Sequence, residues 1–239
     1  MTNPIGYVDG TVNVMTGCIA DFDCYRDCWA RKWAHRHCHN PTFSRKDRAK
    51  YAGFRPAYWP ERLKQLPRGK GKWKAVNFMG DMFCRGQRQE AQDATLAVLG
   101  LEESNTYLIL TKRSGAMLSY MQGWKRRNIP WDCSNVLFGT SVSTPADVRS
   151  RLPALMKLAK LGFRVWVSVE PMMEAVDLRK YMKRLAWVVC GGKDGEIPPA
   201  EWFNDLFWQC RYAPGKRVPF WLKGKGVAKT WQRKPEFKP

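Results

Sequence analysis

The stretch Phe163-Arg-Val-Trp-Val-Ser-Val169, followed at once by Glu170-Pro171, is the part of the chain that decides the fold. Its β-branched and aromatic residues predict a strand, and its nearly continuous apolar character is typical of a strand buried on both faces. Such strands belong to parallel sheets that helices cover. Glu170 then stands directly after the predicted strand.

The same unit repeats along the chain in both directions. Strands are expected at residues 11–14, 74–79, 106–111, 135–142, 163–169, 186–190 and 218–222. Helices are expected at residues 25–36, 88–101, 115–124, 145–161, 178–185 and 199–210. Strands that alternate with helices indicate βαβ units. No Gly-x-Gly-x-x-Gly pattern follows the first strand, which disfavours a dinucleotide-binding fold. The repeat predicts one α/β domain over residues 1–239, a partial (β/α)6 TIM-like barrel.

Polar residues and glycines follow the predicted strands, where such barrels carry their active sites. These strand-end residues are Gly80, Asp81, Lys112, Arg113, Ser141, Ser143, Glu170, Gly191 and Gly192.

Three cysteines follow the first predicted strand, in the run Cys18-Ile-Ala-Asp-Phe-Asp-Cys24-Tyr-Arg-Asp-Cys28. Structural zinc and ordinary electron-transfer clusters take four protein ligands, so three leave one metal position open. This pattern favours a [4Fe–4S] cluster whose fourth iron binds a substrate or cofactor. The alternative is structural zinc with a fourth ligand from the run His35-Arg-His-Cys-His39, in which His35 and His39 share a helix face. Of the other cysteines, Cys133, Cys190 and Cys210 are expected in the core, whereas Cys84 is a candidate hydrogen donor or radical relay.

The charge balance points to a polyanionic partner. The chain has 41 Lys and Arg against 21 Asp and Glu, a formal net charge of +20. Nucleic acid is the first candidate for such a chain. With no signal-like N-terminus and no apolar run of about 18 residues, we expect a cytoplasmic protein without a membrane role.

Cations and aromatic residues alternate in two regions, an insertion at about residues 39–73 and a tail at about 216–239. Cations suit phosphates and aromatic rings suit bases. The candidate nucleic-acid-binding residues are Arg45, Lys46, Arg48, Lys50, Arg55, Lys70, Lys72, Lys223 and Lys225.

The ordered motifs resemble the radical S-adenosylmethionine (SAM) superfamily, in particular a group of radical-SAM-like proteins that phages and bacteria encode. The resemblance rests on Asn13-Val-Met-Thr-Gly-Cys18, Cys28-Trp-Ala30, Phe78-Met-Gly-Asp-Met-Phe83, Leu110-Thr-Lys-Arg113, residues 135–142, Val167-Ser-Val-Glu-Pro171, Trp187-Val-Val-Cys-Gly-Gly192 and Pro219-Phe-Trp-Leu-Lys223. The superfamily's commonest cysteine spacing leaves three and then two residues between cysteines, whereas this chain leaves five and then three.

The resemblance implies a role for each matching position. Cys18, Cys24 and Cys28 would hold the cluster, and SAM would bind its fourth iron. Gly80 and Asp81 would meet the SAM amino group. Ser141, Ser143 and Glu170 would meet its ribose or carboxylate, and Gly191 and Gly192 its adenine. Catalytic roles would fall to Cys84, Lys112 and Glu170, with Lys112 on a substrate phosphate or the SAM carboxylate.

The implied reaction cleaves SAM to a 5′-deoxyadenosyl radical that abstracts a substrate hydrogen. For phage proteins of this kind the expected substrate is DNA, with rearrangement of an amino-acid adduct on thymidine, an isomerisation. Base repair by a lyase, base methylation and a non-catalytic zinc-containing DNA-binding protein are the alternatives. A monomer, an external electron donor such as a flavodoxin, and, for a phage gene, the host cytoplasm complete the expectation.

Overall fold

A computed structural model describes residues 5–21, 23–129 and 133–236. It divides the chain into two compact units, residues 8–110 and residues 5–7 together with 111–236. The end of the predicted basic tail, residues 237–239, lies outside the described residues. No helix in these ranges is long and apolar enough to cross a bilayer.

Three parallel strands build the sheet of the 8–110 unit, in the order β1 (Gly10–Val12), β4 (Trp73–Val76) and β5 (Thr106–Thr111). The strand expected at 11–14 is shorter than predicted, because it ends at Val12, and the next short strand, β2 (Met15–Thr16), belongs to a separate two-stranded sheet. Helix α1 (Trp29–His39) follows, preceded by the 3-10 turn η1 (Asp23–Tyr25), and α3 (Gln89–Leu101) connects β4 to β5.

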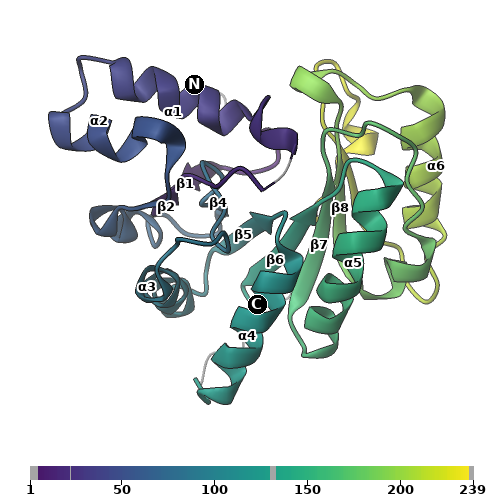
Figure 1. The fold of residues 1–239 in the computed structure, drawn as a ribbon. Coiled ribbons are helices and arrows are strands. Elements are labelled where there is room, and N and C mark those ends of the chain that lie inside the picture. The colour runs from purple at the N-terminus through teal and green to yellow at the C-terminus, as the bar shows by residue number, and fades with distance from the viewer. Residues whose placement is uncertain (1–4, 22, 130–132, 237–239) are drawn as a thin grey trace. The chain divides into compact units, whose positions relative to one another are not determined.

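The predicted basic insertion is a folded part of this unit. It contains α2 (Arg45–Tyr51), η2 (Ala52–Phe54), β3 (Ala57–Tyr58) and η3 (Pro60–Gln65). Strand β3 pairs antiparallel with β2, and Trp59 donates from its indole N–H to Thr16 Oγ1 at 2.8 Å. Helices α1 and α2 pack together with η2 (Figure 1). The insertion therefore builds directly on the segment that enters the cysteine loop.

Four parallel strands build the sheet of the other unit, in the order β6 (Val136–Ser141), β7 (Arg164–Val169), β8 (Leu185–Cys190) and β9 (Phe220–Leu222). Helix α4 (Ser114–Arg126) packs on α5 (Pro145–Lys160), which lies along β6 and β7 (Figure 1). The link after β7 is a 3-10 helix, η4 (Arg179–Arg184), instead of the expected α-helix, and α6 (Ala200–Arg211) follows β8. Short 3-10 turns, η5 (Lys193–Gly195) and η6 (Lys229–Trp231), complete the unit.

Tyr7, Trp166, Trp187 and Trp221 pack together in this second unit, mostly edge to face, with contacting ring centroids 5.4–6.4 Å apart. Gly139 leaves room for one of them, since a Cβ there would lie 2.3 Å from the Trp166 indole nitrogen. The predicted alternation of parallel strands and helices is confirmed in both units.

Candidate functional site

The three predicted cluster ligands lie in one loop between β2 and α1. Cys18 and Cys28 are half-buried, whereas Cys24 is exposed in η1. Backbone hydrogen bonds fix both ends of the loop. The Cys18 N–H donates to Phe54 O at 3.0 Å, and Cys28, which precedes the first residue of α1, accepts at its carbonyl from Lys32 N–H at 3.1 Å. Phe22 lies outside the described residues.

Cys18 and Cys28 pack against the same apolar cluster, whose buried members include Ala30, Phe54 and Trp59. Both ends of the motif therefore rest on one rigid support. In the ranges that the structure describes, no three His, Cys, Asp or Glu side chains are gathered as a metal-ligand set. Three thiols remain the donor type that an iron–sulfur cluster takes.

The predicted SAM-amino segment, Gly80-Asp81, lies directly against the start of this loop. A Cβ on Gly80 would come within 2.5 Å of Gly17 O and 2.6 Å of Gly17 N, so no side chain fits there. The Asp81 N–H donates to Gly17 O at 3.2 Å, and Gly17 N–H donates to Met79 O at 3.0 Å. Two segments that are far apart in sequence thus meet beside Cys18.

Two asparagine side chains tie the same segments together. Asn13 Oδ1 accepts from Met79 N–H at 2.8 Å, and Asn77 Oδ1 accepts from Met15 N–H at 2.8 Å. Asn77 has a positive φ of 62°, a conformation that Asn adopts more readily than most residues. These reciprocal bonds hold the end of β4 on the end of β1.

Asp81 and Cys84 are both buried in the turn after Gly80. Asp81 Oδ1 accepts from Phe83 N–H at 3.0 Å, and Asp81 O accepts from Cys84 N–H at 3.2 Å. The turn is closed by its own hydrogen bonds. Its predicted roles, amino-group binding by Asp81 and hydrogen donation by Cys84, stay predictions.

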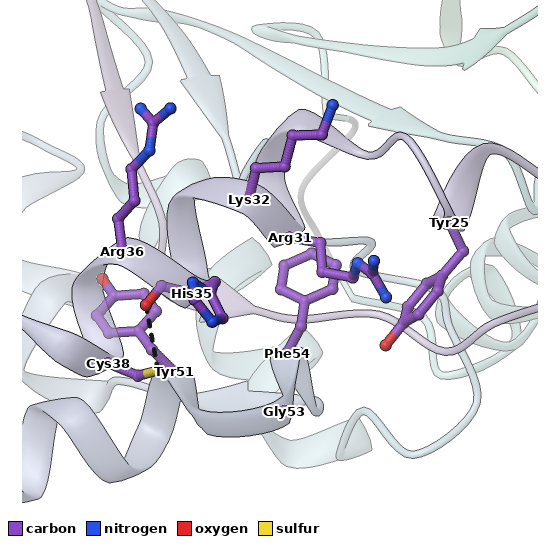
Figure 2. Close-up of a pocket in the computed structure, with 9 residues that line it drawn as sticks. All are labelled: Tyr25, Arg31, Lys32, His35, Arg36, Cys38, Tyr51, Gly53 and Phe54. Carbon is purple, nitrogen blue, oxygen red and sulfur yellow. Dashed lines mark hydrogen bonds between the residues drawn. The ribbon is translucent and has the colours of Figure 1, made fainter.

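A pocket of about 480 Å³ opens on the same unit, between α1 and η2 (Figure 2). Cationic and polar side chains of α1 form one wall, and aromatic rings form the rest. The lining residues are Tyr25, Arg31, Lys32, His35, Arg36, Cys38, Tyr51, Gly53 and Phe54. The Arg31 guanidinium lies 4.9 Å from the centre of the Tyr25 ring.

The histidines and Cys38 occupy the far end of α1 from Cys28. The expectation that His35 and His39 share a face is confirmed by a ring-centroid distance of 4.4 Å, and Cys38 Sγ lies 3.1 Å from His39 Nδ1. At about 1.5 Å per residue, His35 is roughly 10 Å and Cys38 roughly 15 Å along the helix from Cys28. The zinc alternative, with a fourth ligand from this end of α1, stays a prediction.

Part of the insertion's positive charge is used inside the unit. Lys50 Nζ lies 3.3 Å from Glu61 Oε1 and 4.3 Å from the Trp59 ring. Arg62 lies 3.7 Å from the same ring and donates to Asn13 O at 3.0 Å. The Arg48 Nε atom is buried. The predicted nucleic-acid-binding residues that the structure leaves exposed are Arg45, Lys46, Arg55, Lys70, Lys72 and Lys225.

In the other unit, Ser141 and Ser143 lie at the carboxyl end of β6. An ion pair holds their backbone: Arg151 donates to Ser141 O at 2.7 Å, and Asp147 Oδ2 accepts from Ser143 N–H at 2.8 Å. Arg151 and Asp147 themselves are 2.6 Å apart on α5. Lys112, half-buried, follows β5 directly.

Glu170, after β7, forms a hydrogen-bonded ion pair with Lys223, after β9. Gly191, after β8, lies beside this pair, and a Cβ there would be 3.3 Å from Lys223 Cβ and 3.5 Å from Glu170 Cδ. Gly192 makes a tight turn in which its N–H donates to Glu196 O at 2.9 Å. The carboxyl ends of three neighbouring strands thus bring Glu170, Gly191 and Lys223 together.

Burial sets the ionisation of several groups of this unit. It raises the pKa of Tyr7 well above its ordinary value, with a smaller contribution from the Glu170 charge. It also raises the pKa of the Cys190 and Cys210 thiols, so both stay protonated at neutral pH. Neither cysteine is therefore a nucleophile, in keeping with the core role expected for them.

One family model matches residues 2–237, nearly the whole chain, and its description is "protein of unknown function (DUF5131)". The chain belongs to this family. No curated protein and no solved structure matches the chain.

Several residues that shape these sites in this DUF5131 chain were not predicted from the sequence. Arg151 and Asp147 lie within a helix that reads as an ordinary amphipathic helix, and Lys223 lies 53 residues from Glu170. The run of cations in 31–36 that lines the pocket is visible in the sequence, but a charge run alone does not show a cavity. Lys32 and Arg36 are the residues from which a site on this helix could have been predicted.

Proposed function

We propose that this protein is a radical SAM enzyme that modifies DNA bases, with a [4Fe–4S] cluster bound by Cys18, Cys24 and Cys28. The observation that carries the proposal is the contact of Gly80 with Gly17. It places the segment expected to bind the SAM amino group beside the first cysteine of the segment expected to bind the cluster.

The donor set fits the cofactor. Three thiols in one loop, with both ends fixed by backbone hydrogen bonds, can hold three irons and leave the fourth for SAM. The exposed Cys24 lies between the two anchored cysteines.

A bound and reduced cluster with SAM would supply radical chemistry for removing a hydrogen atom from the substrate. The chain's own part is to bind, orient and exclude water. Gly80 supplies a backbone with no side chain in the way, and Asp81 supplies a buried carboxylate next to it. Roles for Cys84, Lys112, Ser141, Ser143, Glu170, Gly191 and Gly192 are part of the same proposal and rest on the resemblance.

The net charge of +20 supports DNA as the substrate. Within that class we propose isomerisation of an amino-acid adduct on thymidine. A hydrogen atom is removed from the adduct, a bond to carbon is rearranged, and the hydrogen atom is returned. Substrate and product therefore have the same composition. A lyase or methyltransferase acting on the same polymer would change the composition instead, and mass spectrometry of the digested nucleosides separates these outcomes.

The test begins with the cofactor. The protein, reconstituted anaerobically with iron and sulfide, is expected to turn brown and to contain about four irons per chain. Single Cys18→Ser, Cys24→Ser and Cys28→Ser variants should lose most of this iron. Cys38→Ser is the matched control, because Cys38 is a half-buried cysteine that packs against the same apolar cluster. A colourless protein with one tightly bound zinc would refute the proposal.

The activity test uses the reduced holoenzyme with SAM. Formation of 5′-deoxyadenosine is expected in the wild type and not in the three cysteine variants. Adduct-bearing DNA should then give a new nucleoside isomer of unchanged mass. A protein that holds the cluster and cleaves SAM but forms no new isomer would refute the proposed isomerase activity. The cofactor assignment would stand.

A further inference from the structure

Two tryptophans stand out on the surface of α1. Trp29 is 52% exposed and Trp33 is 47% exposed, although Trp is usually well covered in a folded protein. Because they are four residues apart, the two indoles lie on one face of the helix. Two exposed indoles on one helix face are a candidate binding surface.

The same face carries cations. Because successive residues of a helix are about 100° apart, Lys32 and Arg36 project from the same side of α1 as the two tryptophans. The Arg36 guanidinium lies 5.7 Å from the Trp33 ring. Helix α1 itself contains no acidic residue. Asp27 lies 3.9 Å from Lys32, but both side chains are largely exposed, and such pairs contribute little. We refer to Trp29, Lys32, Trp33 and Arg36 as the α1 surface.

The α1 surface continues into the pocket shown in Figure 2. Lys32 and Arg36 belong to both, Arg31 extends the cationic wall, and His35 adds a polar ring. At about 480 Å³ the pocket lies within the size range of small-ligand sites, roughly 300–1,000 Å³. Its aromatic side, formed by Tyr51 and Phe54, supplies no negative charge. A phosphate group next to this wall would find cations on one side and no competing carboxylate among the lining residues.

We infer that the α1 surface binds single-stranded DNA, with bases stacked on Trp29 and Trp33 and the backbone phosphates held by Lys32, Arg36 and the adjoining pocket. The inference rests on the proposed function for its substrate and deepens it by naming where the strand lies. Cations alternating with aromatic faces are the chemistry of single-strand recognition. A base has an open face for an indole only when it is unstacked, which favours a single strand over a duplex.

This assignment differs from a general basic patch. In the insertion, Lys50 and Arg62 are held against Trp59, a buried ring that no base can reach. On α1, by contrast, both indoles are about half exposed. The α1 surface is thus the place in the described 8–110 unit where large exposed aromatic side chains and cations occur together.

The first test measures the affinity of the full chain for a fluorescent oligothymidine by anisotropy. Trp29→Ala and Trp33→Ala are each expected to weaken binding about fivefold or more, the low end of the loss of one stacked base. Leu101→Ala is the matched control, since Leu101 is 85% exposed on α3 of the same unit and carries no ring, and it should bind as the wild type does. Circular dichroism checks that each variant is folded, and Trp33→Phe should keep part of the affinity.

The second test measures the salt dependence of binding. Lys32→Ala and Arg36→Ala should each reduce the slope of log K against log salt by about 0.7, the value for one lost phosphate contact to a single strand. Lys157→Ala and Lys160→Ala, two exposed cations of α5, should leave that slope unchanged. A duplex of the same sequence should bind more weakly than the single strand.

The outcomes separate this inference from the proposed function. Folded Trp29→Ala and Trp33→Ala variants that bind oligothymidine like the wild type would overturn the inference, whatever the cluster does. A surface that docks another protein would give that same result. Loss of binding in these variants, together with a protein that holds no cluster, would support the α1 surface and refute the radical SAM proposal.

Discussion

Gly17 and Gly80 lie backbone against backbone, so close that a Cβ on Gly80 would stand 2.5 Å from Gly17 O. Gly17 also has a φ of +83°, and a Cβ there would lie 2.0 Å from Arg55 O. Three segments therefore meet at one point: the start of the cysteine loop, the turn after β4 and the insertion. The contact needs glycine at both positions.

Gly80→Ala is expected to lower the free energy of unfolding by about 1–3 kcal/mol, because the added methyl group meets backbone that has no room to yield. Chemical denaturation of wild type and variant measures the change. Gly115→Ala is the control: Gly115 lies in α4 with open space around it, and alanine there should stabilise by about 0.5–1 kcal/mol. Equal stability of Gly80→Ala and wild type would show that the two segments are not held together as described.

Cysteine alkylation should follow exposure. With iodoacetamide under native conditions, Cys24 is expected to react first, because it is the exposed member of the trio. Cys190 and Cys210 should react last, since burial both shields the sulfur and raises the thiol pKa, leaving little thiolate. Peptide mass spectrometry over a time course gives the order, and denatured protein should label at all eight positions. Early labelling of Cys190 would contradict the buried strand β8.

The strands and helices could be predicted because their apolar runs and periodicities are local. Residues 163–169 and 106–111 read as buried strands, and both are. The fold of the insertion could not be predicted in the same way, because it depends on distant partners. Trp59 donates hydrogen bonds to Thr16 and Val14, which lie more than 40 residues earlier. A cation run in sequence does not reveal that Arg62 faces inward.

The sequence predicts which strand ends carry the candidate site, but it does not predict the contacts between the side chains there. Glu170 and Gly191 were singled out because they follow strands, and parallel register brings such positions together. The sequence does not identify the partner of Glu170: it predicts Lys223 on a nucleic-acid surface, whereas the β8–β9 pairing brings Lys223 beside the carboxylate. Side-chain pairing across strands is tertiary information that one sequence does not carry.

The Glu170–Lys223 pair offers a direct energetic test. Its two side chains are 22% and 24% exposed, between a surface pair and a buried one. Glu170→Gln and Lys223→Met should each cost about 1–3 kcal/mol, because each leaves a half-buried charge without its partner. The double variant should cost less than the two single costs added together, which a double-mutant cycle in urea measures. Strict additivity would mean that the pair does not contribute to stability.

Lys74 of β4 should make stability rise with pH in the alkaline range. Its buried ammonium donates to Leu66 O and Arg68 O, and burial lowers its pKa below the ordinary 10.5, against a smaller opposing effect of Glu102. Between the lowered pKa and 10.5 the unfolded chain binds more protons than the folded one, so the free energy of unfolding increases with pH.

Lys74→Met removes this contribution and two hydrogen bonds, at a cost of about 1–3 kcal/mol. The cost should widen as the pH rises toward 10.5, measured by urea unfolding at each pH. Lys72→Met, an exposed neighbour, should show a cost near zero at every pH. A Lys74→Met cost that stays constant across this range would contradict the lowered pKa of Lys74.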